Sequence, residues 1–158
     1  MPLSTLLGLL LLAVAQVAAP AGPEHFFVGR TEGVGVVDVF LSGRHKVRDR
    51  SHGRIDASGA LLINQVVEEE GKPARTRRWR LVRSSPLRIS GTISDARGPV
   101  AGEIKGNVLY LRYRSTEGPS VEQRITLHPD GRTASNSMTF RKFGFKVATM
   151  ESTIRRMD

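Results

Sequence analysis

Apolar and polar residues alternate with a period of two through most of this chain. Leu109, Leu111 and Tyr113 fall at every second position, and the apolar residues of 121–127 do the same. A period of two places successive side chains on opposite faces of an extended strand. No apolar stripe has helical spacing, and a single helical turn is possible near 23–27. The pattern therefore predicts half-buried antiparallel strands.

Turn residues divide the chain at intervals of about ten residues, a spacing that suits strands better than helices. Clusters of Gly, Pro, Asp and Ser recur, among them 56–59, 71–73, 95–99 and 129–131. Such clusters supply the positive φ angles and the capping oxygens that tight turns need. Between them we predict strands over 31–41, 44–56, 60–69, 74–83, 87–94, 99–105, 107–115, 120–128, 132–142 and 145–156.

Consecutive strands joined by short hairpins form an up-and-down meander, here of about eight to ten strands. A sheet of this length accumulates twist and leaves two exposed edges, which closure into a barrel removes. We therefore expect an all-β fold, an antiparallel meander closed into a small barrel that is able to hold one ligand. A two-sheet β-sandwich is the alternative.

The N-terminal segment differs in composition from the rest of the chain. Residues 6–15 form an apolar run, small residues follow it, and the first charged side chain is Glu24. A membrane-spanning helix needs about 20 apolar residues, so this shorter run predicts a secretory signal peptide. We assign 1–21 to the signal peptide and 22–158 to a single domain. The protein is then expected in the periplasm or in association with the cell envelope.

The chain has 158 residues, no cysteine and a net charge of +9. The lack of cysteine excludes disulfides, thiolate metal sites and a cysteine nucleophile. An exported protein does not meet nucleic acid, so the basic charge favours an anionic membrane surface or an acidic amphipathic molecule as partner. We expect a monomer.

No set of residues in the sequence forms a recognisable catalytic or metal site. His45 and His52 are seven residues apart, which is an odd offset, and His128 precedes a proline. An odd offset places two side chains on opposite faces of a regular strand. Neither a serine-nucleophile elbow nor a phosphate-binding loop occurs. We therefore predict no metal, no cofactor and no enzymatic activity, and a protein that acts by binding.

The predicted strand 74–83 carries arginines on both faces around the single tryptophan, Trp79. If the guanidinium of Arg78 or Arg80 enters the barrel, it is suited to bind an acidic head group. The alternative is that these cations point outward and pair with acidic residues of neighbouring strands. The candidate ligand-binding residues are Trp79, Arg78, Arg80, Tyr110, Arg112, Tyr113 and Arg124. The predicted apolar lining includes Ile89, Ile93, Leu109, Leu111, Ile125, Leu127, Val34, Val36 and Phe40.

Three phenylalanines and three cations are interleaved within 140–146. In the meander this stretch is the hairpin between the last two strands, with Gly144 in the left-handed turn position. One interpretation is that the rings plug an end of the barrel and fix the register of the closing hairpin. The other is that Phe143 points outward among cations and contacts a membrane or a ligand portal. The residues of this hairpin motif are Met138, Phe140, Lys142, Phe143, Gly144 and Phe145.

Three segments, 27–35, 102–113 and 138–148, occur in an order that resembles a bacterial family of exported domains of unknown function. The family is regarded as lipocalin-like, or calycin-like, and its C-terminal motif M-x-x-x-K-F-G-F-K-V corresponds to residues 138–147. The resemblance implies a lipocalin-like barrel and an envelope protein of Gram-negative type. It supplies no catalytic residues.

These inferences favour an exported barrel that binds a lipid-like or amphipathic acidic ligand. The alternative is a barrel with a filled interior that interacts with anionic membranes and binds no small molecule. An enzyme that modifies envelope lipids is a third hypothesis, for which no acid–base pair or nucleophile is found at a useful spacing.

Overall fold

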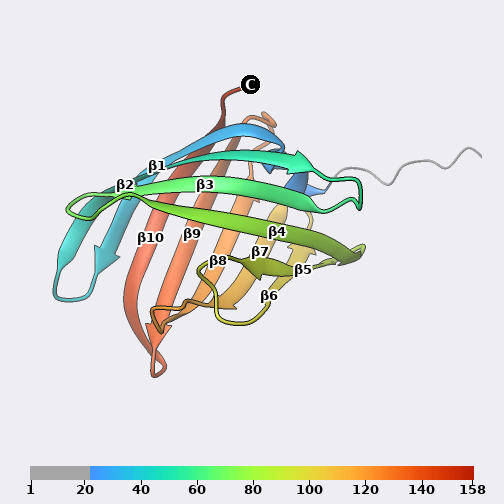
Figure 1. Ribbon diagram of the computed structural model, residues 1–158. Coiled ribbons are helices and arrows are strands. Elements are labelled where there is room, and N and C mark those ends of the chain that lie inside the picture. Colours follow the sequence, from blue (N-terminus) through green and yellow to red (C-terminus); the bar gives the residue numbers. More distant parts are fainter. Residues whose placement is uncertain (1–21) are drawn as a thin grey trace, which may run out of the picture.

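A computed structural model describes residues 22–158, and the predicted signal peptide, 1–21, lies outside the described residues. Ten antiparallel strands form a closed barrel in which each strand pairs with its neighbours in sequence (Figure 1). No helix within 22–158 is long and apolar enough to cross a membrane. The elements are η1 (Pro23–Phe27), β1 (Gly29–Val39), β2 (Gly43–Ile55), β3 (Leu61–Glu69), β4 (Arg75–Ser85), β5 (Arg88–Ile93), β6 (Val100–Lys105), β7 (Val108–Arg114), β8 (Ser120–Leu127), β9 (Thr133–Lys142) and β10 (Phe145–Arg156).

The predicted meander is confirmed, and every strand begins and ends within two residues of its predicted bounds. The alternative of a two-sheet sandwich is wrong, because β1 pairs with β10 from Thr31↔Arg156 to Val39↔Ala148. That pairing hydrogen-bonds the first strand to the last and leaves the sheet without a free edge. The predicted helical turn near 23–27 is the 3-10 helix η1.

Helix η1 covers one end of the barrel. The ring of Phe26 is 3% exposed and packs into the core, a burial that contributes about 1.5–3 kcal/mol. The backbone of η1 lies directly against β2 at Gly53, where a Cβ atom would come within 1.9 Å of the Phe27 carbonyl oxygen. An ion pair of 2.8 Å between Glu24 and Arg83 joins η1 to β4. We call this end of the barrel the closed end.

The opposite end, which we call the mouth, carries the turns β1–β2, β3–β4, β5–β6, β7–β8 and β9–β10. The β5–β6 loop is fastened to the β7–β8 hairpin by backbone hydrogen bonds, from Arg97 to Arg114 at 2.7 Å and from Thr116 to Asp95 at 2.9 Å. This fastening holds Asp95 at the mouth, next to the inner wall.

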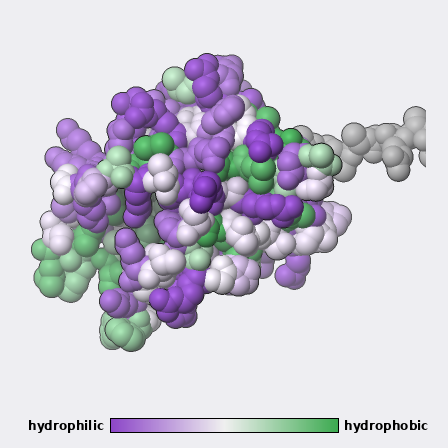
Figure 2. Space-filling model, viewed as in Figure 1, coloured by the Kyte–Doolittle hydropathy of each residue, from purple (hydrophilic) through white to green (hydrophobic). Residues whose placement is uncertain are grey.

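The hairpin motif lies at the mouth, between β9 and β10. Phe143 and Gly144 have φ angles of 52° and 79°, and positive φ at both central residues is what a two-residue type I′ hairpin requires. The interpretation that these rings plug the barrel is wrong, since Phe143 is 90% and Phe145 is 75% exposed. Phe143 lies in the turn and Phe145 is opposite Lys142 in the last pair of the ladder, whereas Phe140 turns inward and lines the cavity. Figure 2 shows apolar surface gathered at the tips of the β1–β2 and β9–β10 hairpins.

The β8–β9 turn at the closed end is organised around Asp130. Its carboxylate accepts hydrogen bonds from the backbone N–H groups of Arg132 at 2.8 Å and Thr133 at 2.9 Å, and from the Thr133 hydroxyl at 2.7 Å. These donors favour the charged form and lower the pKa of Asp130 to about 2. The same Thr133 hydroxyl bonds the His128 ring, whose other nitrogen reaches Ser135 at 2.8 Å. The arrangement ties both strands to the turn.

Replacing Asp130 by alanine is expected to lower the melting temperature at neutral pH. Because the folded-state pKa of Asp130 is below its ordinary value of 3.8, its stabilising effect is complete above that value and is lost as the pH falls towards about 2. Thermal unfolding of wild type and Asp130→Ala across this range should show the two melting temperatures converging. A difference that stays constant down to the acid end would contradict this account of the turn.

Candidate ligand-binding cavity

The barrel encloses a cavity of about 290 Å³. Ligand pockets typically measure roughly 300–1,000 Å³, so this one suits a single chain or a small ring system. Its wall includes Lys72, Glu117 and Pro119 at the mouth and Phe27 near the closed end. The cavity therefore runs from the mouth towards η1.

The deep part of the cavity is apolar. Leu81, Leu109, Ile125 and Ile154 line it and are each at most 4% exposed. They come from four different strands, because every second residue of each strand points into the barrel. Hydrocarbon placed against them would be removed from water on all sides.

Arg77 lies on the cavity wall, between the apolar deep part and the mouth. Its guanidinium pairs with Asp95 at 2.9 Å and donates to the Tyr113 hydroxyl at 3.0 Å. It also lies over the ring of Trp79, at 4.8 Å from the ring centre, and Trp79 meets Tyr113 edge to face. A buried charge needs this many partners to be stable. Arg77 is thus committed to holding β4, β7 and the β5–β6 loop together.

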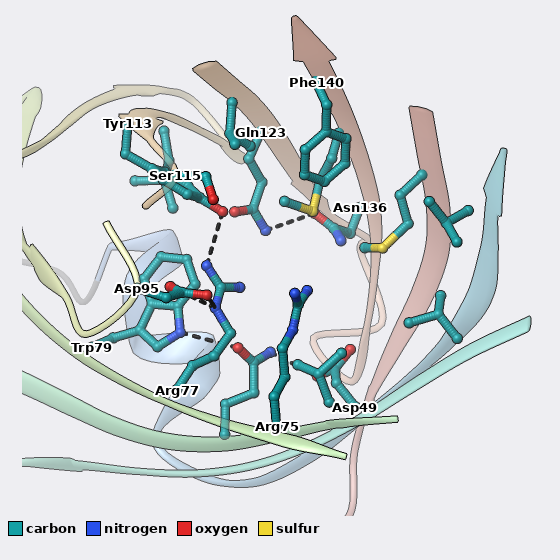
Figure 3. Close-up of a pocket in the computed structure, with 18 of the residues that line it drawn as sticks. Asp49, Arg75, Arg77, Trp79, Asp95, Tyr113, Ser115, Gln123, Asn136 and Phe140 are labelled. Carbon is teal, nitrogen blue, oxygen red and sulfur yellow. Dashed lines mark hydrogen bonds and ion pairs between the residues drawn. The ribbon is translucent and has the colours of Figure 1, made fainter. Parts of the chain in front are cut away.

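Arg75 stands beside Arg77 and extends into the cavity (Figure 3). The ion pairs on this wall join Lys72 to Glu69 at 3.1 Å and Arg77 to Asp95, and they leave Arg75 without a carboxylate partner among residues 22–158. Arg75 is exposed at the mouth. Its five N–H donors are therefore available to a group that enters the cavity.

Glu69 and Gln123 each have a buried side-chain oxygen that receives no hydrogen bond from the described residues, but Glu69 Oε1 has an ion-pair partner in Lys72 at 3.1 Å, and no such partner serves Gln123. Its Nε2 donates to Asn136 Oδ1 at 2.9 Å, and Asn136 Nδ2 in turn donates to Ser152 Oγ at 3.1 Å. The Oε1 atom of Gln123 is buried and receives no hydrogen bond from the described residues. A buried acceptor without a donor costs about 1–3 kcal/mol. The cavity thus presents one acceptor that a donor group inside it would satisfy.

Asp49 lies on the wall opposite Tyr113 (Figure 3). It accepts a hydrogen bond of 3.0 Å from Gln65, which itself accepts one of 3.0 Å from the indole N–H of Trp79. Burial raises the pKa of Asp49 above its ordinary value, although the Gln65 bond and the charge of Arg77 oppose the shift. Gly33 leaves room for the carboxylate, since a Cβ atom there would lie 2.3 Å from Asp49 Oδ2.

Two of the seven candidate ligand-binding residues, Trp79 and Tyr113, line the cavity. Arg78, Arg80, Arg112 and Arg124 are exposed on the outside of the barrel, and Tyr110 lies there beneath Lys105 at 5.4 Å. Arg112 is 3.6 Å from Glu103, as in the alternative of outward cations paired across strands. The arginines that enter the barrel are instead Arg75 and Arg77, because they lie on the same face of β4 as Trp79.

In the hairpin motif, Met138 and Phe140 line the cavity, while Lys142, Phe143, Gly144 and Phe145 are exposed.

Sequence reasoning missed the polar residues of the inner wall. In β8, Gln123 lies between Val121 and Ile125 in the row of alternate residues that faces inward, and this position in the alternating pattern could have identified it as part of the lining. The predicted lining was also wrong in β1, where Val34 is 57% exposed and Val37 faces inward. Valines occupy both faces of that strand, so hydrophobicity alone does not identify the inner one.

The closed meander defines a lipocalin-like antiparallel barrel with an internal cavity. The chain belongs to the family described as protein of unknown function DUF3833, whose sequence profile matches residues 13–156. No curated protein matches it.

Solved structures share the fold at low sequence identity. An S-type phycobiliprotein lyase, CPES, from Guillardia theta has a TM-score of 0.69 at 11% identity, over 88% of this chain and 94% of that one. Rv2717c from M. tuberculosis has a TM-score of 0.64 at 14% identity, over 84% and 94%. A protein of unknown function from the DUF3598 family of Nostoc punctiforme has a TM-score of 0.56 at 13% identity, over 84% of this chain and 48% of that one. At these identities the likeness establishes the fold alone.

Replacing Asp49 by asparagine is expected to raise the melting temperature at neutral pH. The asparagine Oδ1 still accepts the Gln65 hydrogen bond, and no carboxylate has to be buried. Because the folded-state pKa of Asp49 is above 3.8, wild type loses stability as the pH rises through that pKa, and below 3.8 the two proteins should have similar melting temperatures. Thermal unfolding at both ends of this range is the measurement. A lower melting temperature for Asp49→Asn at neutral pH would show that attraction to Arg77 outweighs the cost of burial.

Proposed function

We propose that the barrel binds one amphipathic molecule, with its hydrocarbon part in the apolar depth and an acidic end near Arg75 at the mouth. The observation that carries this proposal is the order of groups along the cavity, from buried aliphatic side chains to an unpaired guanidinium. A filled barrel, the alternative, would need packed side chains where the cavity of about 290 Å³ lies.

Among the charged residues of the wall, Arg75 is the cation that is available to an acid. Lys72 and Arg77 are already neutralised by Glu69 and Asp95. The lining also carries Asp49 and Glu117, so an anion is favoured beside Arg75 and not elsewhere on the wall. Arg75 therefore remains as the cation of the lining without a carboxylate partner among residues 22–158, and its planar set of donors suits a carboxylate or phosphate.

The unpaired Oε1 of Gln123 adds a second requirement. A ligand hydroxyl or amide N–H at mid-depth would donate to this atom and remove the cost of leaving it unsatisfied. A hydroxylated acyl chain has a donor of this kind, in addition to an acidic end and a hydrocarbon tail. We place such binding in the cell envelope, in keeping with the signal peptide expected at 1–21.

Trp79 provides a direct measurement, because it is the single tryptophan of the chain and lines the cavity. Titration with saturated fatty acids of increasing length should change its fluorescence. Affinity should rise roughly fourfold per methylene, from about 0.8 kcal/mol for each group buried, until the tail reaches Phe27. The matched alcohol should bind more weakly and the matched amine more weakly still.

Arg75→Gln is expected to weaken binding of the fatty acid by about fivefold, since an exposed charged contact contributes about 1 kcal/mol, and to leave the alcohol unaffected. Arg78→Gln is the matched control, because Arg78 lies on the outer face of the same strand. Equal affinity for acid and alcohol in wild type, or an equal loss in both variants, would overturn the assignment of Arg75. If no fatty acid of the series gives saturable binding, the proposed function itself is wrong.

A further inference from the structure

Four large apolar side chains are exposed on two neighbouring hairpins at the mouth. Phe40 and Leu41 on the β1–β2 hairpin are 69% and 92% exposed, and Phe143 and Phe145 on the β9–β10 hairpin are 90% and 75% exposed. The two hairpins lie side by side because β1 pairs with β10, and the Phe40 N–H donates to the Val147 carbonyl at 2.9 Å. We call residues 39–43 and 142–146 the paired tips.

The backbone of the paired tips does not favour these side chains. Within 22–158, the non-glycine residues with positive φ are Leu41 at 67° and Phe143 at 52°, one on each tip. Bulky L-residues rarely adopt this conformation, which glycine and asparagine adopt more readily. Both side chains also lack core contacts, since they are about nine-tenths exposed. Stability of the barrel therefore explains neither residue.

Cations surround the exposed apolar groups. Residues 38–46 and 141–149 contain Arg44, Lys46, Arg141, Lys142 and Lys146 against one acidic residue, Asp38. Apolar side chains at the point of a loop with cations just behind them match a phospholipid surface, where hydrocarbon lies beneath anionic head groups. Figure 2 shows the apolar surface at these tips next to strongly polar surface.

We propose that the paired tips dock the protein on an anionic phospholipid bilayer, with the four apolar side chains in the interfacial region and the cations at the head groups. The mouth of the cavity then faces the membrane, since Val39 at the base of one tip and Val147 and Ala148 directly behind the other line the cavity. Docking of this kind depends on the surface alone and is independent of any ligand in the barrel.

The first test is co-sedimentation of the mature chain with vesicles of phosphatidylcholine, with and without phosphatidylglycerol. Wild type should bind the anionic vesicles and lose affinity as salt is added. Phe143→Asn and Leu41→Asn should each weaken binding by about tenfold, because each removes one buried apolar group. The melting temperatures of these two variants should be equal to or above that of wild type, because asparagine adopts a positive φ angle with less strain than leucine or phenylalanine. Leu87→Asn is the matched control, since Leu87 is 64% exposed in the β4–β5 turn at the closed end.

The second test separates the tips from the general basic charge. Lys142→Gln and Lys146→Gln should each reduce affinity for anionic vesicles by about fivefold, whereas Lys105→Gln, at the closed end, should not. Equal losses for tip and closed-end variants, or no binding by wild type, would overturn the proposal. It would also be overturned if wild type forms a dimer in solution that Phe143→Asn abolishes while vesicle binding is unchanged, because the tips would then bind a second copy of the chain.

Discussion

Pairing of the first strand with the last is the constraint on which the rest of the structure depends. From Thr31↔Arg156 to Val39↔Ala148 the register of β1 and β10 is continuous, and because side chains alternate along a strand, a shift of one residue would exchange the inner and outer faces. The same pairing brings the β1–β2 and β9–β10 hairpins together at the mouth, although they are about a hundred residues apart in sequence. Closure thus determines both the lining of the cavity and the composition of its rim.

Within the closed barrel, Arg77 organises the upper part of the wall. A buried guanidinium is costly unless it is paired. Asp95 in the β5–β6 loop and Tyr113 on β7 accept its hydrogen bonds, and the ring of Trp79 on β4 lies beneath it. The Trp79 indole N–H continues the network to Gln65 and Asp49 on β3 and β2. Because this network uses its own charges, it leaves Arg75 as the cation open to a ligand. A lumen with several charged residues can therefore present one cation without an ion-pair partner among residues 22–158.

The fold was predictable from the sequence because turn residues and alternation act locally. Strand bounds came within two residues, and the number of hairpins favoured a closed barrel over the alternative of a two-sheet sandwich. The face of each strand was harder to predict where both faces carry the same kind of residue. In β4, arginines occupy both parities, and only the parity of Trp79 separates Arg77 inside from Arg78 outside. In β1, inward Gly33 makes room for Asp49, a contact between strands that hydrophobicity does not encode.

The two ends of the barrel differ in the contacts that their apolar side chains make. At the closed end Phe26, the Glu24–Arg83 ion pair and the close contact at Gly53 exclude water and fix η1. At the mouth the apolar side chains of the tips cover nothing in the protein, and two of them occupy backbone conformations that an asparagine would adopt more readily. Exposed apolar residues that neither pack nor relax the backbone are the basis of the proposed membrane contact. The apolar groups that stabilise the fold and the exposed ones on the paired tips are therefore at opposite ends, and the cavity opens at the end where we propose that the membrane docks.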